Sequence, residues 1–320
     1  MSRPWQPERG DLAGRLDESG LGQACPQVIR TLDVEYLGGL TLIRGQTVRH
    51  DVFVLIVLVA IILPACSDSP APTSVPAVPS DVTIRVKTVD TFCPTENEQA
   101  RRFYNDALEL AEQGKLEDAK QLYLQAVELD PGYCDAMDNL GRLLRSQGKV
   151  DEAISWYKRS IKLLPNNTVA HQNLALAYGI QSKMTDAVAE YQLLVQIDPN
   201  NPEGYYGLGT IHLELKQPQE AVTQLKKAEE LYTKQSSPLI SDARYALGVS
   251  YYALQKWENA RNYFELIYSE MQDNPRVNYF LGLCYLSPEI YNLELGKRYL
   301  RKAQELGVDL PADVLRRIGK

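Results

Sequence analysis

Cysteine and histidine are the residues of this 320-residue chain whose side chains could do chemistry most directly. The cysteines are Cys25, Cys66, Cys93, Cys134 and Cys284, and no two of them form the CxxC pair of zinc modules and thiol redox enzymes. No HExxH zinc motif, GxSxG nucleophile turn or glycine-rich phosphate loop occurs. We therefore expect no catalytic residue, no metal site and no cofactor, and hence a protein that is not an enzyme.

Cys66 stands at the end of an apolar run. Asp51 and Asp68 bracket sixteen uncharged residues, equivalent to roughly 24 Å of helix against a hydrocarbon core of roughly 30 Å. Pro64 interrupts the run. A secretory signal needs a shorter apolar core behind basic residues, which Arg44 and Arg49 supply here. The run fits a signal peptide better than a membrane-spanning helix.

The sequence Leu63-Pro64-Ala65-Cys66 resembles the lipobox of bacterial lipoprotein signal peptides, although proline at the second position before the cysteine departs from the usual pattern. The resemblance implies cleavage before Cys66, a diacylglyceryl thioether on its sulfur and a further acyl chain on its amine. Two or more chains give stable anchoring. Ser67 follows the cysteine in place of aspartate, so the inner-membrane retention signal is absent. The alternative is a short transmembrane anchor in which Cys66 is incidental.

These features divide the first 95 residues. We expect residues 1–47 to be a non-native or disordered extension, with translation beginning near Val48, and residues 48–65 to be the signal peptide. Residues 66–95 would be the lipidated cysteine and a Pro/Ser-rich spacer, because prolines at 70, 72, 76 and 79 oppose regular helix. The protein would then lie in the cell envelope, facing the periplasm or the exterior.

A 34-residue period dominates the rest of the chain. It places Pro131, Pro165 and Pro199 at equal spacing, and a second set of positions follows it: Ala119, Ala153, Ala187, Tyr123, Tyr157 and Tyr191. A fixed period of this length indicates stacked helix pairs. Small residues at 107, 141, 175 and 209 would let the paired helices approach closely.

This pattern resembles the tetratricopeptide repeat (TPR) family. The resemblance implies an all-α, right-handed α-solenoid of about six helix pairs, followed by a capping helix at 309–320. The repeats would occupy 96–308, as 100–133, 134–167, 168–201, 202–240, 241–274 and 275–308.

In this family the first helix of each pair lines a concave groove that binds extended peptides or partner helices. Carried over by position, the groove residues here are Asn105, Asn139, Asn173, Arg142, Tyr206, Tyr245, Tyr252, Tyr279 and Phe280. The asparagines could pair with a peptide backbone, or could be ordinary repeat residues. The aromatic rings could be binding hot spots, or could pack on one another and on the cap. Asp135 and Asp138 are expected to offset Arg142 and Arg145.

Two further features limit the partners. The net charge of −7 argues against nucleic acid, so we expect proteins or peptides as partners, with a lipid anchor in the membrane. The clamp that binds chaperone C-termini lacks its cations, since Tyr104, Val169 and Asn173 stand at the positions that match its lysines and arginine. Outside the cytoplasm Cys93 and Cys134 could form a disulfide. The oligomeric state is not predicted.

The combination predicts a membrane-anchored scaffold that holds partner proteins of a cell-envelope assembly. Its layout of lipid anchor, spacer and repeats is similar to that of the pilotin lipoproteins of type IV pilus assembly. The alternatives are a membrane-anchored receptor whose groove senses a peptide and has a regulatory role, and an enzyme whose activity lies in the N-terminal segment.

Overall fold

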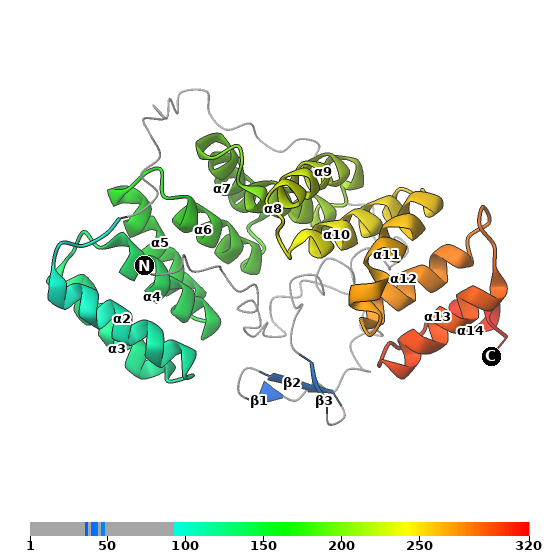
Figure 1. Cartoon of the computed structure of the whole chain (residues 1–320), viewed down its shortest axis with the longest axis horizontal. Helices are drawn as coiled ribbons and strands as arrows, with labels where there is room; N and C mark the ends of the chain where they lie inside the picture. The colour runs from blue at the N-terminus through cyan, green and yellow to red at the C-terminus, as the bar shows by residue number, and fades with distance from the viewer. Residues whose placement is uncertain (1–35, 38–39, 44–45, 49–92, 320) are drawn as a thin grey trace. The chain divides into compact units, whose positions relative to one another are not determined.

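The computed structural model describes residues 36–37, 40–43, 46–48 and 93–319 (Figure 1). Cys66, the apolar run and most of the expected spacer lie outside these residues. Three short strands, β1 (Tyr36–Leu37), β2 (Leu40–Ile43) and β3 (Gln46–Val48), form an antiparallel sheet in that order. Thr41 of β2 pairs with Tyr36 on one side and Val48 on the other.

The all-α prediction is confirmed, because residues 93–319 form thirteen helices. They are α2 (Glu98–Glu112), α3 (Leu116–Leu129), α4 (Cys134–Ser146), α5 (Val150–Leu163), α6 (Thr168–Ile180), α7 (Met184–Ile197), α8 (Pro202–Glu214), α9 (Pro218–Lys234), α10 (Ile240–Ala253), α11 (Trp257–Met271), α12 (Pro275–Tyr285), α13 (Leu293–Glu305) and α14 (Ala312–Arg317). Helices α2 to α13 pack as six consecutive pairs, and α14 follows the last pair (Figure 1).

The helices divide into two compact units. Unit 1 contains α2–α7 and ends at Ile197, and unit 2 contains α8–α14 and begins at Asp198. In unit 1 the first helices of successive pairs, α4 and α6, begin at Cys134 and Thr168, which reproduces the 34-residue spacing of the sequence. In unit 2 the second helix α9 is longer, with 17 residues, so that α10 does not begin until Ile240.

Side-chain caps explain where many first helices begin. The side-chain oxygens of Asn97, Asn167, Asn201 and Asn274 accept hydrogen bonds from backbone N–H groups in the first turns of α2, α6, α8 and α12. These N–H groups would otherwise have no acceptor within the helix. The recurrence of asparagine immediately before a first helix is therefore a local start signal in the sequence.

A close approach fixes each helix pair. In the second pair, a Cβ atom added to Gly141 of α4 would lie 2.5 Å from Cε1 of Tyr157 on α5. Tyr157 is fully buried, so its ring occupies the space that a side chain at position 141 would need. The small residues of the period are thus required by the packing of one helix against the other.

Left-handed backbone ends the first helices. Gly114 and Gly148 adopt φ of 75° and 77°, which glycine does without strain. In later repeats Ser182, Lys216 and Gln255 adopt φ of 56°, 57° and 58° at the matching turn. The turn geometry is kept, since the N–H after the left-handed residue still bonds back to the helix, for example Gln217 N to His212 O at 2.8 Å.

Replacing Lys216 with glycine should therefore raise the free energy of unfolding by about 0.5–1 kcal/mol, because glycine has no Cβ atom to disfavour the left-handed backbone conformation. Equilibrium denaturation of the full chain measures the change. The matched control is Lys162→Gly within α5, where glycine should cost about 1 kcal/mol. A destabilised Lys216→Gly variant would show that the turn is not strained.

Candidate partner-binding surface

The first helices of unit 1 are linked by polar side chains. We define the first-helix face as the surface carrying Tyr104 and Asn105 of α2, Asp135, Asn139, Arg142 and Arg145 of α4, and Asn173 of α6. Nδ2 of Asn139 donates to Oη of Tyr104 at 3.0 Å, which joins α4 to α2. Nη2 of Arg145 donates to Oδ1 of Asn173 at 3.4 Å, which joins α4 to α6.

The three predicted asparagines have different environments. Asn105 is exposed. Asn139 donates both to Tyr104 and to the backbone oxygen of Asp135, at 2.9 Å, and it accepts from Nη2 of Arg142 at 3.1 Å. Asn173 accepts from Arg145. Asn139 and Asn173 thus orient arginine side chains, and Asn105 is the one whose amide faces solvent.

Asp138 does not offset the arginines in the way that the sequence suggested. It is buried, and its Oδ2 accepts from Nδ2 of Asn167 at 2.6 Å. Burial raises the pKa of the Asp138 carboxyl to about 7, although hydrogen bonds from Asn167 and Ser160 act in the opposite direction. Much of its negative charge is therefore lost near neutral pH.

Asp135 is also directed elsewhere. Its Oδ1 accepts from the backbone N–H of Cys93 at 3.4 Å, and burial raises the pKa of its carboxyl. Neither aspartate forms an ion pair with Arg145 in the described part of the chain.

Arg145 is the most unusual side chain of this face. Its exposed fraction is 4%, and its Nε and Nη1 atoms have no hydrogen-bond partner among the described residues. It lies next to Tyr157: burial raises the pKa of that phenol, and the positive charge of Arg145 and a hydrogen bond from its side chain both oppose the rise. A buried guanidinium with unused donors is energetically costly, because arginine stays charged at any ordinary pH.

For the aromatic residues of unit 2 the structure favours the second of the two alternatives, in which the rings pack on one another. Tyr245, Tyr279 and Phe280 have exposed fractions of 7%, 6% and 1%. Their rings pack on one another: the centroid of Phe280 lies 6.5 Å from that of Tyr245, 5.6 Å from that of Tyr279 and 5.1 Å from that of Tyr252. Mutual edge-to-face packing therefore buries most of this cluster.

The terminal helix is joined to the end of α12, because Nη2 of Arg317 donates to the backbone oxygen of Leu286. Val314 of α14 and Ile318, which follows it, are buried. Burial is the main cause of the raised pKa of Tyr279, and the carboxylate of Asp313 on α14 is a smaller one. Tyr206 and Tyr252 keep part of their surface exposed, and Tyr206 packs edge-on against Tyr232 at 6.4 Å.

Cys93 and Cys134 form a disulfide in the structure, with their Cα atoms 5.3 Å apart. It joins the segment before α2 to the first residue of α4, and Cys134 is fully buried. Cys284 is buried and has a free thiol. Its burial raises the pKa of this thiol to about 12. This thiol is therefore protonated and unreactive at neutral pH.

The two histidines in the repeats have structural partners. Nδ1 of His171 lies 2.6 Å from Oε2 of Glu190, and its Nε2 lies 3.0 Å from the backbone oxygen of Pro165. Nδ1 of His212 lies 2.8 Å from Oε1 of Gln217. Among the described residues no group of three or more His, Cys, Asp or Glu side chains could hold a metal ion, and no helix is long and apolar enough to cross a membrane.

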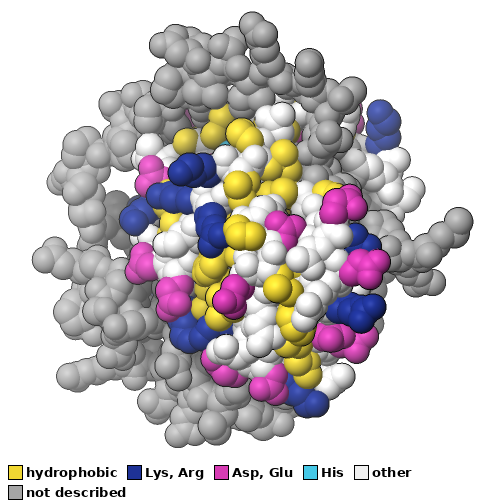
Figure 2. All heavy atoms as spheres, turned by 90° about the vertical axis from the view of Figure 1, so that its left-hand side faces the viewer, with side chains coloured by type: hydrophobic (Ala, Val, Ile, Leu, Met, Phe, Trp, Pro, Cys, Tyr) yellow, Lys and Arg dark blue, Asp and Glu magenta, His cyan; other side chains and the backbone are white. Residues whose placement is uncertain are grey.

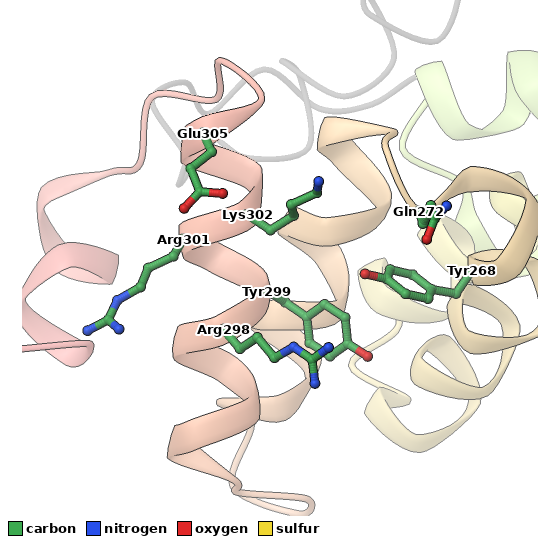
Figure 3. A pocket seen from close by; sticks show the side chains of 7 residues that line it. All are labelled: Tyr268, Gln272, Arg298, Tyr299, Arg301, Lys302 and Glu305. Carbon is green, nitrogen blue, oxygen red and sulfur yellow. The ribbon is translucent and has the colours of Figure 1, made fainter.

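A second surface, which the sequence did not suggest, lies between second helices of unit 2. A cleft of about 450 Å³ is lined by Tyr268 of α11, by Gln272, and by Arg298, Tyr299, Arg301, Lys302 and Glu305 of α13. In Figure 3 Tyr268 and Tyr299 lie side by side, and Arg301 points away from them. Nζ of Lys302 is paired with Asp273 at 2.9 Å. These residues fall outside the family's groove positions, so the repeat pattern gave no signal for them.

Charge alone does not mark a binding surface here. On the face drawn in Figure 2, Lys and Arg side chains are interspersed with Asp and Glu side chains, and hydrophobic side chains lie between them. Specific recognition would therefore depend on individual oriented groups such as those of the first-helix face.

Two protein-family models match the sequence. The tetratricopeptide repeat model matches residues 104–168, and the model of anaphase-promoting complex, cyclosome, subunit 3 matches residues 181–265. Together with the helix pairs they decide the family. This chain is a tetratricopeptide repeat protein.

Solved structures agree with the TPR fold. The Cut9–Hcn1 hetero-tetramer of the APC/C matches with a TM-score of 0.60 at 17% identity, over 70% of this chain and 44% of that one. PilF of Pseudomonas aeruginosa matches with a TM-score of 0.58 at 19% identity, over 66% of this chain and 92% of that one. A TPR protein from Parabacteroides merdae matches at 0.50 and 18% identity, over 69% of this chain and 98% of that one.

At these identities the likeness extends to the fold, and this chain spans less than half of the Cut9–Hcn1 chain. No curated protein matches the sequence at a significant level. The TPR fold supports a scaffold that binds proteins or peptides, and TPR proteins are in general not catalytic.

Asp138 provides a test of the polar network of the TPR surface. Because its pKa is raised to about 7, the folded state keeps a proton that the unfolded state loses near pH 4, so stability should fall as the pH rises from about 4 to above 7. Between pH 5 and pH 8 the free energy of unfolding of the unaltered chain should fall by on the order of 2–4 kcal/mol because of Asp138, and this fall should be absent in Asp138→Asn. Denaturation at both pH values measures it. Exposed Asp118→Asn should leave the loss unchanged. An equal pH dependence in Asp138→Asn would contradict this environment for the carboxyl.

Proposed function

We propose that this TPR protein is a lipid-anchored scaffold of the cell envelope that holds a partner protein or peptide on the first-helix face of unit 1. The observation that carries the proposal is a pair of cross-helix hydrogen bonds, one from Asn139 to Tyr104 and one from Arg145 to Asn173. They hold polar groups from three successive repeats in fixed orientations. Preorganised polar groups bind an extended segment at a lower entropic cost than mobile ones.

The disulfide supports a location outside the cytoplasm. Cys93 lies at the end of the expected spacer and is bonded to Cys134 at the start of α4. Such bonds persist in oxidising compartments and are rare in the cytosol. The lipobox-like sequence before Cys66 gives the route to that location, and acylation there would leave a short tether before the first helix pair.

Lipidation at Cys66 is directly testable. Expressed in a bacterial host fed an alkyne-tagged fatty acid, the full chain should carry the label and sediment with membranes, whereas Cys66→Ser should carry none. Cys284→Ser is the matched control and should be labelled as strongly as the unaltered chain. Label that survives in Cys66→Ser, or that never appears in the unaltered chain, would exclude the lipoprotein anchor.

Scaffolding on the first-helix face requires a second test. After crosslinking in the host, the membrane-bound chain should recover partner proteins, and Asn105→Lys should reduce the recovery at least about fivefold, because the exposed amide lies in the path of the bound segment. The control is Leu163→Lys, which alters an exposed residue of α5 on a second helix. If both variants recover partner proteins equally well, the binding surface does not lie on the first helices.

A further inference from the structure

We propose that the Cys93–Cys134 disulfide is a redox latch, opened and closed by exchange with a dithiol protein, that regulates the first-helix face. The chain holds its partner when the bond is closed, and its grip weakens when both cysteines are reduced. This inference rests on the proposed function and adds the regulation of its binding surface. It also assigns a reaction to the bond, since its substrate is a pair of adjacent thiols.

The disulfide fastens the first helix pair to the second. In the segment that leads into α2, the backbone oxygen of Thr95 accepts from Nη2 of Arg101 at 2.6 Å, and the side chain of Asn97 caps the helix. These contacts hold the segment to α2. At its other end Cys93 is bonded to Cys134, the first residue of α4. The segment is thus a strap with one end on each helix pair.

The start of α4 lacks the side-chain cap that its neighbours have. Tyr133 precedes α4 and accepts no hydrogen bond through its side chain, whereas Asn167 and Asn201, at the matching positions of the next two repeats, cap α6 and α8. The first N–H groups of a helix have no acceptor within it, and a cap stabilises them. The bond at Cys134 therefore holds a helix end that is otherwise free to fray.

The first turn of α4 supports the first-helix face. Nδ2 of Asn139 donates to the backbone oxygen of Asp135 at 2.9 Å and to Oη of Tyr104 at 3.0 Å. The ring centroid of Tyr133 lies 5.1 Å from that of Tyr104. Both contacts that Tyr104 makes here are thus with residues close to Cys134 in sequence. Fraying of this turn moves the acceptor of Asn139 and loosens α2 from α4.

The exchange begins at Cys93, because this residue keeps part of its surface exposed while Cys134 is fully buried. A thiolate of the dithiol attacks Sγ of Cys93, the S–S bond breaks, and its electron pair leaves with Sγ of Cys134. The second thiolate then attacks the mixed disulfide at the dithiol's own sulfur and displaces Cys93. The chain has gained two electrons, both of its thiolates take protons from water, and the dithiol has become a disulfide. The reverse sequence closes the latch.

Export gives the latch a direction. Thiols are kept reduced in the cytosol, whereas disulfides persist in oxidising compartments. A chain that has not left the cytoplasm therefore presents a loosened first-helix face. It becomes able to hold a partner once the bond has closed, so that the scaffold is active only where it is needed.

Hydrogen exchange of the purified full chain in detergent tests the latch without a partner. After addition of dithiothreitol, amides of α2 and of the first turn of α4 should exchange at least about tenfold faster, while those of α7 and α13 keep their rates. Cys93→Ala should show the fast pattern without reductant and no further response to it. The matched control is Cys284→Ala, at the buried free thiol, which should respond as the unaltered chain does. Unchanged rates in α2 and α4 after complete reduction, verified by thiol titration, would overturn the latch.

Partner recovery after crosslinking in the host tests the regulation. Normalised to the amount of chain in the membrane, recovery by Cys93→Ala should be at least about fivefold lower than by the unaltered chain, because fewer molecules are competent to bind. Cys284→Ala should recover as much as the unaltered chain. In a second measurement, which does not depend on the folding of a variant, isolated membranes receive dithiothreitol before crosslinking. Recovery by the unaltered chain should then fall, and recovery by Cys93→Ala should not change.

The outcomes separate the two proposals. Equal recovery by Cys93→Ala and the unaltered chain, or recovery that does not respond to dithiothreitol, would overturn the regulation and leave the scaffold function intact. If the unaltered, oxidised chain recovers no partner, the proposed function fails and the regulation fails with it, while the exchange rates still decide whether the bond holds α4.

Discussion

The close approach of the two helices in each pair is the constraint on which the other features depend. Gly141 leaves room for the ring of Tyr157, and the buried ring in turn fixes α4 against α5. The same tyrosine hydrogen-bonds to Arg145, whose charge also affects its pKa. Packing inside a repeat and the orientation of a buried polar group are therefore linked through one side chain, and a residue larger than glycine at position 141 would disturb both.

Polar groups of unit 1 extend this order from one repeat to the next. Asn139 connects α4 to α2 through Tyr104, and Asn173 connects α6 to α4 through Arg145. Asn167 caps α6 and also donates a hydrogen bond to Asp138, so one residue both starts a helix and satisfies an oxygen of a buried acid on α4. Unit 2 is stabilised differently: aromatic rings from α10, α11 and α12 pack on one another in its interior.

The repeat period, the all-α class and the small residues at the helix contacts could be predicted from the sequence, because each follows from local geometry repeated every 34 residues. Burial of Tyr279 and Phe280 could not, since the position of a ring in a repeat does not tell whether its neighbours in space are solvent or other rings. The roles of the asparagines were also hidden. Asn105, Asn139 and Asn173 share one position in the repeat, and only the side chains opposite them distinguish a solvent-facing amide from one that holds an arginine. The Tyr268–Tyr299 cleft lies on second helices, where the family pattern gives no guide.

The most direct measurement is a structure of the full chain bound to the partner that it captures in its host. The account predicts that the partner segment runs along α2, α4 and α6 and contacts Asn105 on the first-helix face. A partner seated on second helices, for instance in the cleft between α11 and α13, would contradict it.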